Sequence, residues 1–151
     1  MASTATSLAT DPVKQFSVFL DNRMGRLSDL YTLLQGNNVH LMAIMVMDMT
    51  DTAIVRLVVD DPDKAAKLLA EAGFSWKAAE VLALEFGEES ELRGVLAALL
   101  EAEVNIHYVY SFIKRPRGKS GLVLSVEDAE IAALALNHRG FRVLAQHDIS
   151  R

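Results

Sequence analysis

The chain contains no cysteine among its 151 residues. This absence excludes disulfide bonds, thiolate metal sites and catalytic thiols. It also suits the cytoplasm, where disulfides are rare, and we predict a cytoplasmic protein. No stretch of the sequence reaches the roughly 18 uninterrupted apolar residues of a membrane-spanning helix. We therefore expect no contact with a membrane.

The chain also has fewer basic than acidic residues. The chain has 15 basic and 20 acidic residues and a net charge of -5, so it lacks the basic excess that nucleic-acid binding uses. The first residues, MASTATSLATDP, have neither the basic start nor the apolar run of a secretory signal. We predict that residues 1–12 form a disordered polar tail and that nucleic acid is not a partner.

Patterns of catalytic or metal-binding residues are missing as well. None of the four histidines is paired with another ligand at the spacing of metal sites. The carboxylates stand at turns, on helix faces and at loop ends, where solvation explains them, and no nucleophile has a base and an orienting group at a recognisable spacing. We predict no metal, no cofactor and no enzymatic activity.

The sequence does contain an internal repeat. Leu27 and Leu92, each at the start of an apolar helical pattern, are as far apart as Val39 and Val104, each at the start of a strand pattern. Matching residues that precede Leu27 and Leu92 are separated by one residue more than this. Matching residues that follow the strands starting at Val39 and Val104 are separated by two residues more. The second copy has therefore lost one residue in an early loop and gained two in a late one.

The pattern of the first copy predicts strand, helix, two strands, helix and strand. Alternating Phe16, Val18 and Leu20 indicate a first strand with one buried face, while Gly36 ends a helical pattern and Pro62 opens another. The predicted elements are a strand at 13–21, a helix to 36, strands at about 38–48 and 53–60, a helix at 61–73 and a strand to about 86.

The second copy repeats this order. Its predicted elements are a helix at about 90–103, strands at 104–113 and 121–126, a helix at 128–139 and a strand from 141. The segment VLALEF ends the first copy and also begins the second, so one long strand serves both. Right-handed crossovers place both helices of each copy on one face of a four-stranded antiparallel sheet. We predict an α+β fold of two ferredoxin-like βαββαβ units, with domains at 13–80 and 81–151.

The segment LMAIMVM, residues 41–47, is apolar at odd and even positions alike. One layer of helices covers only one face of a sheet, so the other face of this strand must pack on a second sheet or a second subunit. An ordinary core strand with irregular patterning is the alternative, because short apolar runs are ambiguous.

The loop between the first strand and the first helix reads Asp21-Asn22-Arg23-Met24-Gly25-Arg26-Leu27. It resembles the ACT domain, in which the first strand ends in a pattern close to Asn-x-Pro-Gly-x-Leu. Asn22, Gly25 and Leu27 match this pattern, while Met24 replaces the proline. The likeness covers residues 13 to about 148, and the chain is similar to small stand-alone proteins with two ACT domains. Many such proteins sense free amino acids.

The resemblance implies a homodimer and an amino-acid site where this loop of one unit meets the second strand of another. A loop glycine lets backbone amides approach a ligand, and a helix N-terminus attracts a carboxylate. The implied loop residues are Asn22, Arg23, Met24, Gly25, Arg26 and Leu27. The implied strand residues are His40 and Leu41 in the first copy and Asn105 and Ile106 in the second.

The corresponding loop of the second copy, Gly87-Glu88-Glu89-Ser90-Glu91-Leu92, lacks the loop glycine and carries three carboxylates. It should repel a ligand carboxylate, so we expect one site, with the first loop facing Asn105 or Tyr108. Alternatively, Gly25 is only a turn glycine and Asn22 only a capping residue.

Three functions are compatible with these patterns. The chain is an amino-acid-binding regulatory module, or a regulatory subunit of a metabolic enzyme that resembles the small subunit of acetolactate synthase, or a structural dimerisation module without a ligand. We favour the first function, because the first loop keeps the features of a ligand site.

Overall fold

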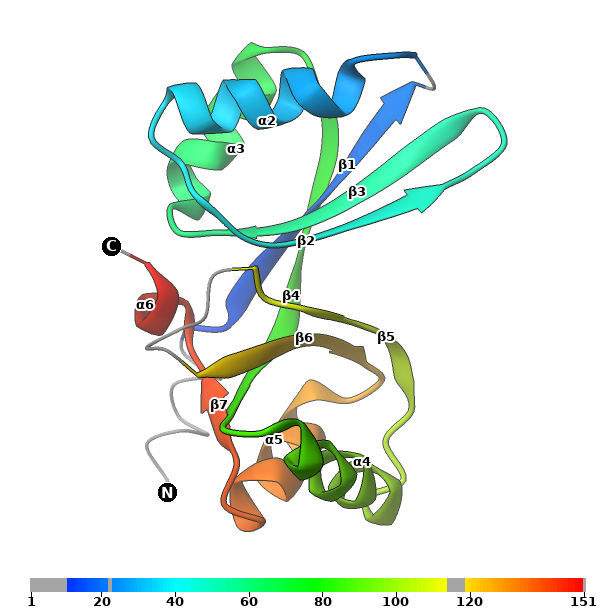
Figure 1. Cartoon of the computed structure of the whole chain (residues 1–151), viewed down its shortest axis with the longest axis vertical. Coiled ribbons are helices and arrows are strands. Elements are labelled where there is room, and N and C mark those ends of the chain that lie inside the picture. The colour runs from blue at the N-terminus through cyan, green and yellow to red at the C-terminus, as the bar shows by residue number, and fades with distance from the viewer. Residues whose placement is uncertain (1–10, 22, 114–118, 151) are drawn as a thin grey trace.

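The computed structural model describes residues 11–21, 23–113 and 119–150. Its first unit contains β1 (Val13–Asp21), α2 (Arg26–Gly36), β2 (Leu41–Asp48), β3 (Thr52–Val59), α3 (Pro62–Glu71) and β4 (Ser75–Phe86). The second contains η1 (Glu89–Glu91), α4 (Leu92–Glu101), β5 (Ile106–Ser111), β6 (Ser120–Val126), α5 (Ala129–His138), β7 (Arg142–Leu144) and α6 (Gln146–Ile149) (Figure 1).

All strand pairs are antiparallel, and β4 is shared between the units. Residues 75–81 of β4 pair with β1, and residues 82–86 pair with β6. The strand orders are β2-β3-β1-β4 in the first unit and β7-β4-β6-β5 in the second. Each is the order of a ferredoxin-like βαββαβ unit. The predicted α+β fold is therefore confirmed.

Two details of the second unit differ from the sequence pattern. The helix expected from residue 90 to residue 103 is a short 3-10 turn, η1, followed by α4. The final helix α6 is four residues long and was not predicted, because a segment of this length is too short for a helical period to be recognised.

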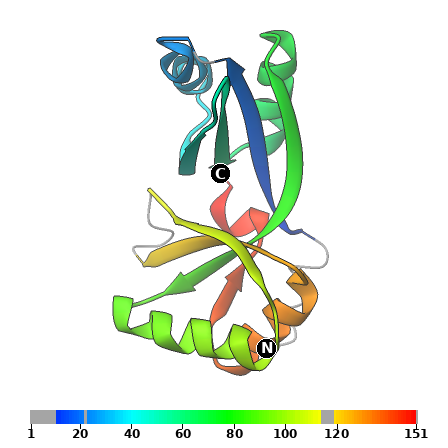
Figure 2. The same ribbon diagram turned by 90° about the vertical axis from the view of Figure 1, so that its right-hand side faces the viewer.

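The molecule is a stack of four layers, with α2 and α3 at one end, the two sheets in the middle, and α4 and α5 at the other end (Figures 1 and 2). One apolar core lies between each helix pair and its sheet. A third core, which includes Val13, Ala43, Val58, Val81 and Val123, lies between the two sheets. The sheet faces away from the helices therefore cover each other within one chain.

A bulge changes the pattern of β2. Its pairing with β3 shifts between Leu41 and Ala43, so Leu41 packs with Ile44 on the helix side, while Ala43 and Met45 face the second sheet. Strict strand alternation along residues 41–47 would put Leu41 on the same face as Ala43 and Met45, and this expectation is wrong because of the bulge. At its start β2 also meets the end of β5, where the Ile113 N–H donates to the Met42 carbonyl over 2.7 Å.

Asp11 is the first residue that the structure describes. Its carbonyl accepts the Gln146 N–H at 2.9 Å and its carboxylate accepts the His147 N–H at 2.8 Å, so it is bound to α6. Residues 1–10 of the predicted tail lie outside the described residues. Within the described ranges, no helix has the length and apolar character needed to cross a membrane.

Candidate functional site

The candidate site begins with the turn between β1 and α2. Gly25, the N-cap of α2, has φ 87° and ψ -6°, which lies in the left-handed region that favours glycine. A Cβ at this position would meet no atom within 4 Å, so the backbone conformation and not space demands glycine. The turn places the N-terminus of α2, whose first N–H groups have no acceptor within the helix, beside a pocket on the surface.

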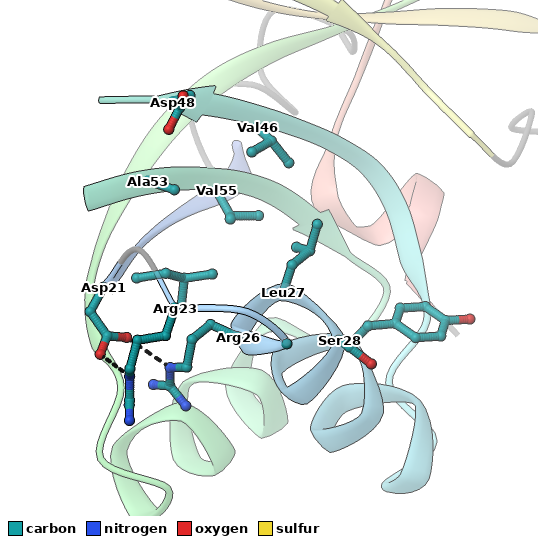
Figure 3. A pocket seen from close by; sticks show the side chains of 12 residues that line it. Asp21, Arg23, Arg26, Leu27, Ser28, Val46, Asp48, Ala53 and Val55 are labelled. Carbon is teal, nitrogen blue, oxygen red and sulfur yellow. Dashed lines mark hydrogen bonds and ion pairs between the residues drawn. The ribbon is translucent and has the colours of Figure 1, made fainter. Parts of the chain in front are cut away.

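A pocket of about 610 Å³ lies beside this turn. Its lining residues come from β1, the turn, α2 and the β2–β3 hairpin: Leu20, Asp21, Arg23, Gly25, Arg26, Leu27, Ser28, Tyr31, Val46, Asp48, Ala53 and Val55. Figure 3 shows Leu27, Val46 and Val55 facing one another across the gap between α2 and the hairpin. Leu27 is 40% exposed and Val46 is 49% exposed, so the middle of the pocket is apolar and open.

Charged groups lie at the ends of the pocket. Arg23 and Arg26 both pair with Asp21, and Arg26 Nε lies 3.0 Å from Asp21 Oδ1. Arg26 also approaches Asp29 at 3.5 Å and lies 4.8 Å from the centre of the Phe74 ring. In Figure 3 the two arginines turn toward Asp21, away from the hairpin. The two guanidinium groups line this end of the pocket together with Asp21, while Asp29, the other partner of Arg26, does not line it.

The ion pairs change the titration of Asp21. Desolvation acts to raise its pKa, but the hydrogen bonds and positive charges of Arg23 and then Arg26 outweigh this and hold the pKa below its ordinary value. Asp48 lies at the end of β2, on the opposite side of the pocket from the arginines, and is exposed (Figure 3). Two paired arginines thus line one end of the pocket, and an exposed aspartate lines the other.

Four of the predicted loop residues line this pocket: Arg23, Gly25, Arg26 and Leu27. Met24 does not line it and is fully exposed. Asn22 lies outside the described residues.

His40 and Leu41 lie near the other end of α2, which is about 16 Å long. The His40 N–H donates to Asp60 Oδ1 at 2.8 Å, and His40 Nδ1 lies 2.8 Å from Asp60 Oδ2. His40 and Leu41 line a separate, smaller pocket of about 190 Å³. Within one chain they are not part of the pocket beside Gly25.

Asn105 and Ile106 belong to the second unit. The Asn105 carbonyl accepts the Glu127 N–H at 2.9 Å, and Ile106 packs against the core beneath α4 and α5. The two units lie at opposite ends of the molecule (Figures 1 and 2), so one chain does not bring Asn105 to the loop of the first unit. A composite site with Asn105 requires a second chain. Tyr108, the other candidate partner, instead contacts Gln15 between the sheets.

In the second unit, the N–H groups of the corresponding loop are already hydrogen-bonded to a carboxylate of the same loop. Glu91 Oε2 accepts the N–H groups of Gly87 at 2.5 Å and Glu88 at 2.9 Å. These hydrogen bonds, first that of Glu88 and then that of Gly87, hold the pKa of Glu91 below its ordinary value. A side chain of the protein thus occupies the backbone donors that a ligand carboxylate would need.

The sequence from residue 11 to residue 151 matches the family described as an ACT domain pair. The chain belongs to this family. The ACT domain pair is similar to a Bacteroides thetaiotaomicron protein of known crystal structure, with 29% identity and a TM-score of 0.83 over 93% of this chain and 96% of that chain. Among curated proteins, none matches.

Two regulatory subunits of aspartate kinase share the fold of the ACT domain pair. The ligand-free subunit from Thermus thermophilus has 13% identity and a TM-score of 0.59, and covers 85% of this chain and 93% of its own. The subunit from Thermus flavus has 14% identity and a TM-score of 0.57, and covers 86% of this chain and 94% of its own. At such low sequence identity, the similarity between these subunits and this chain shows a shared fold and no more.

Sequence reasoning missed the part of the pocket that comes from the β2–β3 hairpin. Asp21 pairs with Thr52 and Asp48 pairs with Ala53, so the hairpin returns to the level of the loop. The predicted order of strands contains this information, since β3 lies beside β1 in every ferredoxin-like unit. The last residues of β2, and not its first residues, therefore lie close to the loop between β1 and α2.

The described residues contain no group of three or more His, Asp or Glu side chains that could hold a metal ion.

Proposed function

We propose that this ACT domain pair is a regulatory module that binds a free amino acid and has no catalytic activity of its own. One observation carries the proposal: the pocket beside the left-handed Gly25 combines a helix N-terminus, an end lined by two arginines, an apolar middle and an end lined by an aspartate. Its volume of about 610 Å³ falls in the range of small-molecule sites, roughly 300–1,000 Å³.

The charges of the pocket suit a zwitterion. An α-carboxylate at the start of α2 gains from the helix dipole and from hydrogen bonds that the guanidinium groups of Arg23 and Arg26 can donate. An α-ammonium group directed toward the hairpin gains from the Asp48 carboxylate. Together these groups orient an amino acid along the pocket.

The apolar middle favours an aliphatic side chain. Leu27 and Val46 offer carbon surface on the two sides of the gap and are 40% and 49% exposed, while Val55 is buried behind them. Covering this surface with a ligand side chain gains about 25 cal/mol per Å². A charged ligand side chain would lose hydration there without a partner.

The second unit supports a single site per chain. Its loop has Glu91 where the first unit has Arg26, and this carboxylate already satisfies the backbone donors of the turn. A ligand carboxylate would have to displace it and meet two more glutamates. We infer that the second unit serves as framework and not as a second sensor.

We also propose a cytoplasmic homodimer that transmits ligand binding to a metabolic enzyme. The fold shared with regulatory subunits of aspartate kinase supports such a partner. A subunit resembling the small subunit of acetolactate synthase is the second candidate within this class. A structural module without ligand is the remaining alternative, and the closed loop of the second unit favours it.

The test is a thermal-shift screen of the full chain against the proteinogenic amino acids. A ligand at about 100 times its dissociation constant adds roughly 2.7 kcal/mol to the stability of a protein that binds it only when folded. We expect the shift with aliphatic amino acids and a smaller one or none with charged amino acids. If none of them raises the melting temperature, the chain is not an amino-acid sensor.

Two matched variants locate the site. Gly25→Glu adds a carboxylate to the loop and should abolish the shift. Gly140→Glu is the control, because Gly140 also has a positive φ with nothing within 4 Å but lies in the second unit. A shift that survives Gly25→Glu would move the site elsewhere. A metabolic enzyme that co-purifies with the chain and responds to the same amino acid would identify the partner.

A further inference from the structure

One carboxylate of the protein holds both arginines of the pocket beside Gly25. Asp21 Oδ2 pairs with Arg23 Nε, and Asp21 Oδ1 lies 3.0 Å from Arg26 Nε, so each oxygen receives one guanidinium group (Figure 3). Asp21, Arg23 and Arg26 all line the pocket. An internal carboxylate therefore already binds the two side chains from which the α-carboxylate of an amino acid would accept hydrogen bonds.

The two arginines are held to different degrees. The Arg26 side chain is 27% exposed and has two further contacts, with Asp29 Oδ2 at 3.5 Å and with the Phe74 ring at 4.8 Å from its centre. The Arg23 side chain is 70% exposed, and Asp21 is its only side-chain partner in the part of the chain that the structure describes. Exposed ion pairs of this kind are weak. Arg23 is therefore the arginine that can leave Asp21, while Arg26 keeps its other contacts.

The main chain of Arg23 is fixed on both sides. Its N–H donates to the Asp21 carbonyl at 2.8 Å, and its carbonyl accepts the Arg26 N–H at 3.4 Å. These hydrogen bonds connect Arg23 to the end of β1 and to the start of α2. Exposed side chains change rotamer within nanoseconds. The Arg23 side chain can thus change its partner by rotating about its own bonds, with no movement of the loop.

Arg23 points away from the middle of the pocket while it is paired. Its guanidinium group turns toward Asp21 and away from the β2–β3 hairpin (Figure 3). An amino acid that lies between α2 and the hairpin, with its carboxylate at the start of α2, binds Arg23 only after this side chain has left Asp21. The carboxylates of Asp21 and of the ligand therefore compete for one guanidinium group.

The second unit contains an internal carboxylate with a stronger effect. Glu91 Oε2 accepts the N–H groups of Gly87 and Glu88, which are the backbone donors of that loop. In the first unit, Asp21 binds arginine side chains instead of the N–H groups at the start of α2. The carboxylate of the first unit thus weakens a ligand site without blocking it.

We propose that Asp21 is an internal competitor that sets the affinity of the pocket, because an amino acid must bind Arg23 in place of Asp21. This inference rests on the amino-acid site proposed above. The apparent dissociation constant is the intrinsic constant divided by the fraction of molecules in which Arg23 is free. Asp21 therefore raises the concentration of amino acid at which the pocket fills.

The experiment is isothermal titration calorimetry of the full chain with L-valine, L-leucine and L-isoleucine at neutral pH. Asp21→Asn removes the competing charge and should lower the dissociation constant roughly two- to fivefold, the range that an exposed ion pair supports. Asp29→Asn is the matched control, because it removes the same charge from the first turn of α2 and leaves the pair of Asp21 with Arg23 in place. This control should change the dissociation constant by less than about twofold.

A second pair of variants separates competition from a simple change of charge. Arg23→Gln should weaken binding, and adding Asp21→Asn to Arg23→Gln should then give no gain. A gain that persists without Arg23 would mean that Asp21 acts through its charge alone, which overturns the proposal.

The failure of this proposal differs from the failure of the proposed function. A wild type that binds an amino acid as tightly as Asp21→Asn, or more tightly, overturns the role of Asp21 and leaves the amino-acid site standing. If neither the wild type nor Asp21→Asn binds any of the three amino acids, the proposed function fails and this inference fails with it.

Discussion

Gln15 of β1 accepts a hydrogen bond from the hydroxyl of Tyr110 of β5 at 2.6 Å, across the contact between the two sheets. The same side chain donates to the Tyr108 hydroxyl at 2.7 Å. Gln15 is only 1% exposed, although the alternation of β1 places it on the polar side of the strand. The face predicted as polar is thus part of the core between the units.

Removing Gln15 should weaken the whole fold. Gln15→Leu leaves the buried Tyr110 hydroxyl without its acceptor, which costs about 1–3 kcal/mol. Chemical denaturation measures the loss, and Ser17→Ala, on the same face of β1, is the control and should change stability by less than about 0.5 kcal/mol. The loss in a Gln15→Leu, Tyr110→Phe double variant should be smaller than the sum of the single losses. Additive losses would contradict the coupling.

Tyr110 should make the protein sensitive to alkaline pH. Burial, and then the neighbouring Tyr108, raise the pKa of Tyr110 above its ordinary value of 10.0, although Arg56 acts to lower it. The unfolded chain loses this proton at about pH 10 while the folded chain retains it. The contribution to stability is complete below that pH and is lost as pH rises above it.

Denaturation of wild type and Tyr110→Phe at increasing alkaline pH checks this effect. The variant should show a shallower loss of stability, whereas Tyr31→Phe, at an exposed position, should follow the wild type. Equal slopes for wild type and Tyr110→Phe would refute the role of Tyr110.

We expect Arg56 to lower the free energy of unfolding in its present surroundings. Its Nε and Nη1 atoms are buried and find no hydrogen-bond partner among the described residues, while its guanidinium group lies 4.1 Å from the centre of the Tyr108 ring. Unsatisfied buried donors cost about 1–3 kcal/mol, and a cation–π contact returns about 0.5–2 kcal/mol. Arg56→Met should therefore keep or raise the melting temperature. A clear decrease would mean that the ring contact dominates.

Gly25, the N-cap of α2, and Gly36, the last residue of α2, should respond in opposite directions to alanine. Neither has an atom within 4 Å of an added Cβ, but only Gly25 has a positive φ. Gly25→Ala should therefore destabilise the fold by about 1–2 kcal/mol through backbone strain. Gly36→Ala should be neutral or stabilising by up to about 1 kcal/mol. Equal effects in urea unfolding would show that the left-handed turn relaxes.

Glu91 should contribute stability that is lost in acid. Its pKa is held below the ordinary value of 4.5 by the N–H groups of Glu88 and Gly87. The contribution is present above the unfolded pKa and disappears as pH falls through the lower folded pKa. Glu91→Gln should make stability less dependent on pH below about 4.5. An unchanged acid profile would show that the closed loop contributes nothing.

The fold was largely predictable because its signals are local and occur twice. The alternating residues of β1, the helix stop at Gly36 and the proline at the start of α3 agree with one another, and the second copy repeats the pattern. The loop half of the pocket was predictable for the same reason, since Arg23, Gly25, Arg26 and Leu27 lie within five consecutive residues. The hairpin half, with Val46 and Asp48, was missed because strand order and not sequence distance brings it to the loop.

By itself, the amino-acid sequence determined the two βαββαβ units, the shared strand β4 and the loop with Gly25, because hydrophobic period, turn residues and repeat length are properties of neighbouring residues. Only the tertiary structure decided what each face of the sheets contacts. Gln15 is buried because a second sheet covers it, and Leu41 changes face because of a bulge. These outcomes depend on which surfaces meet, and that depends on packing between segments far apart in the chain.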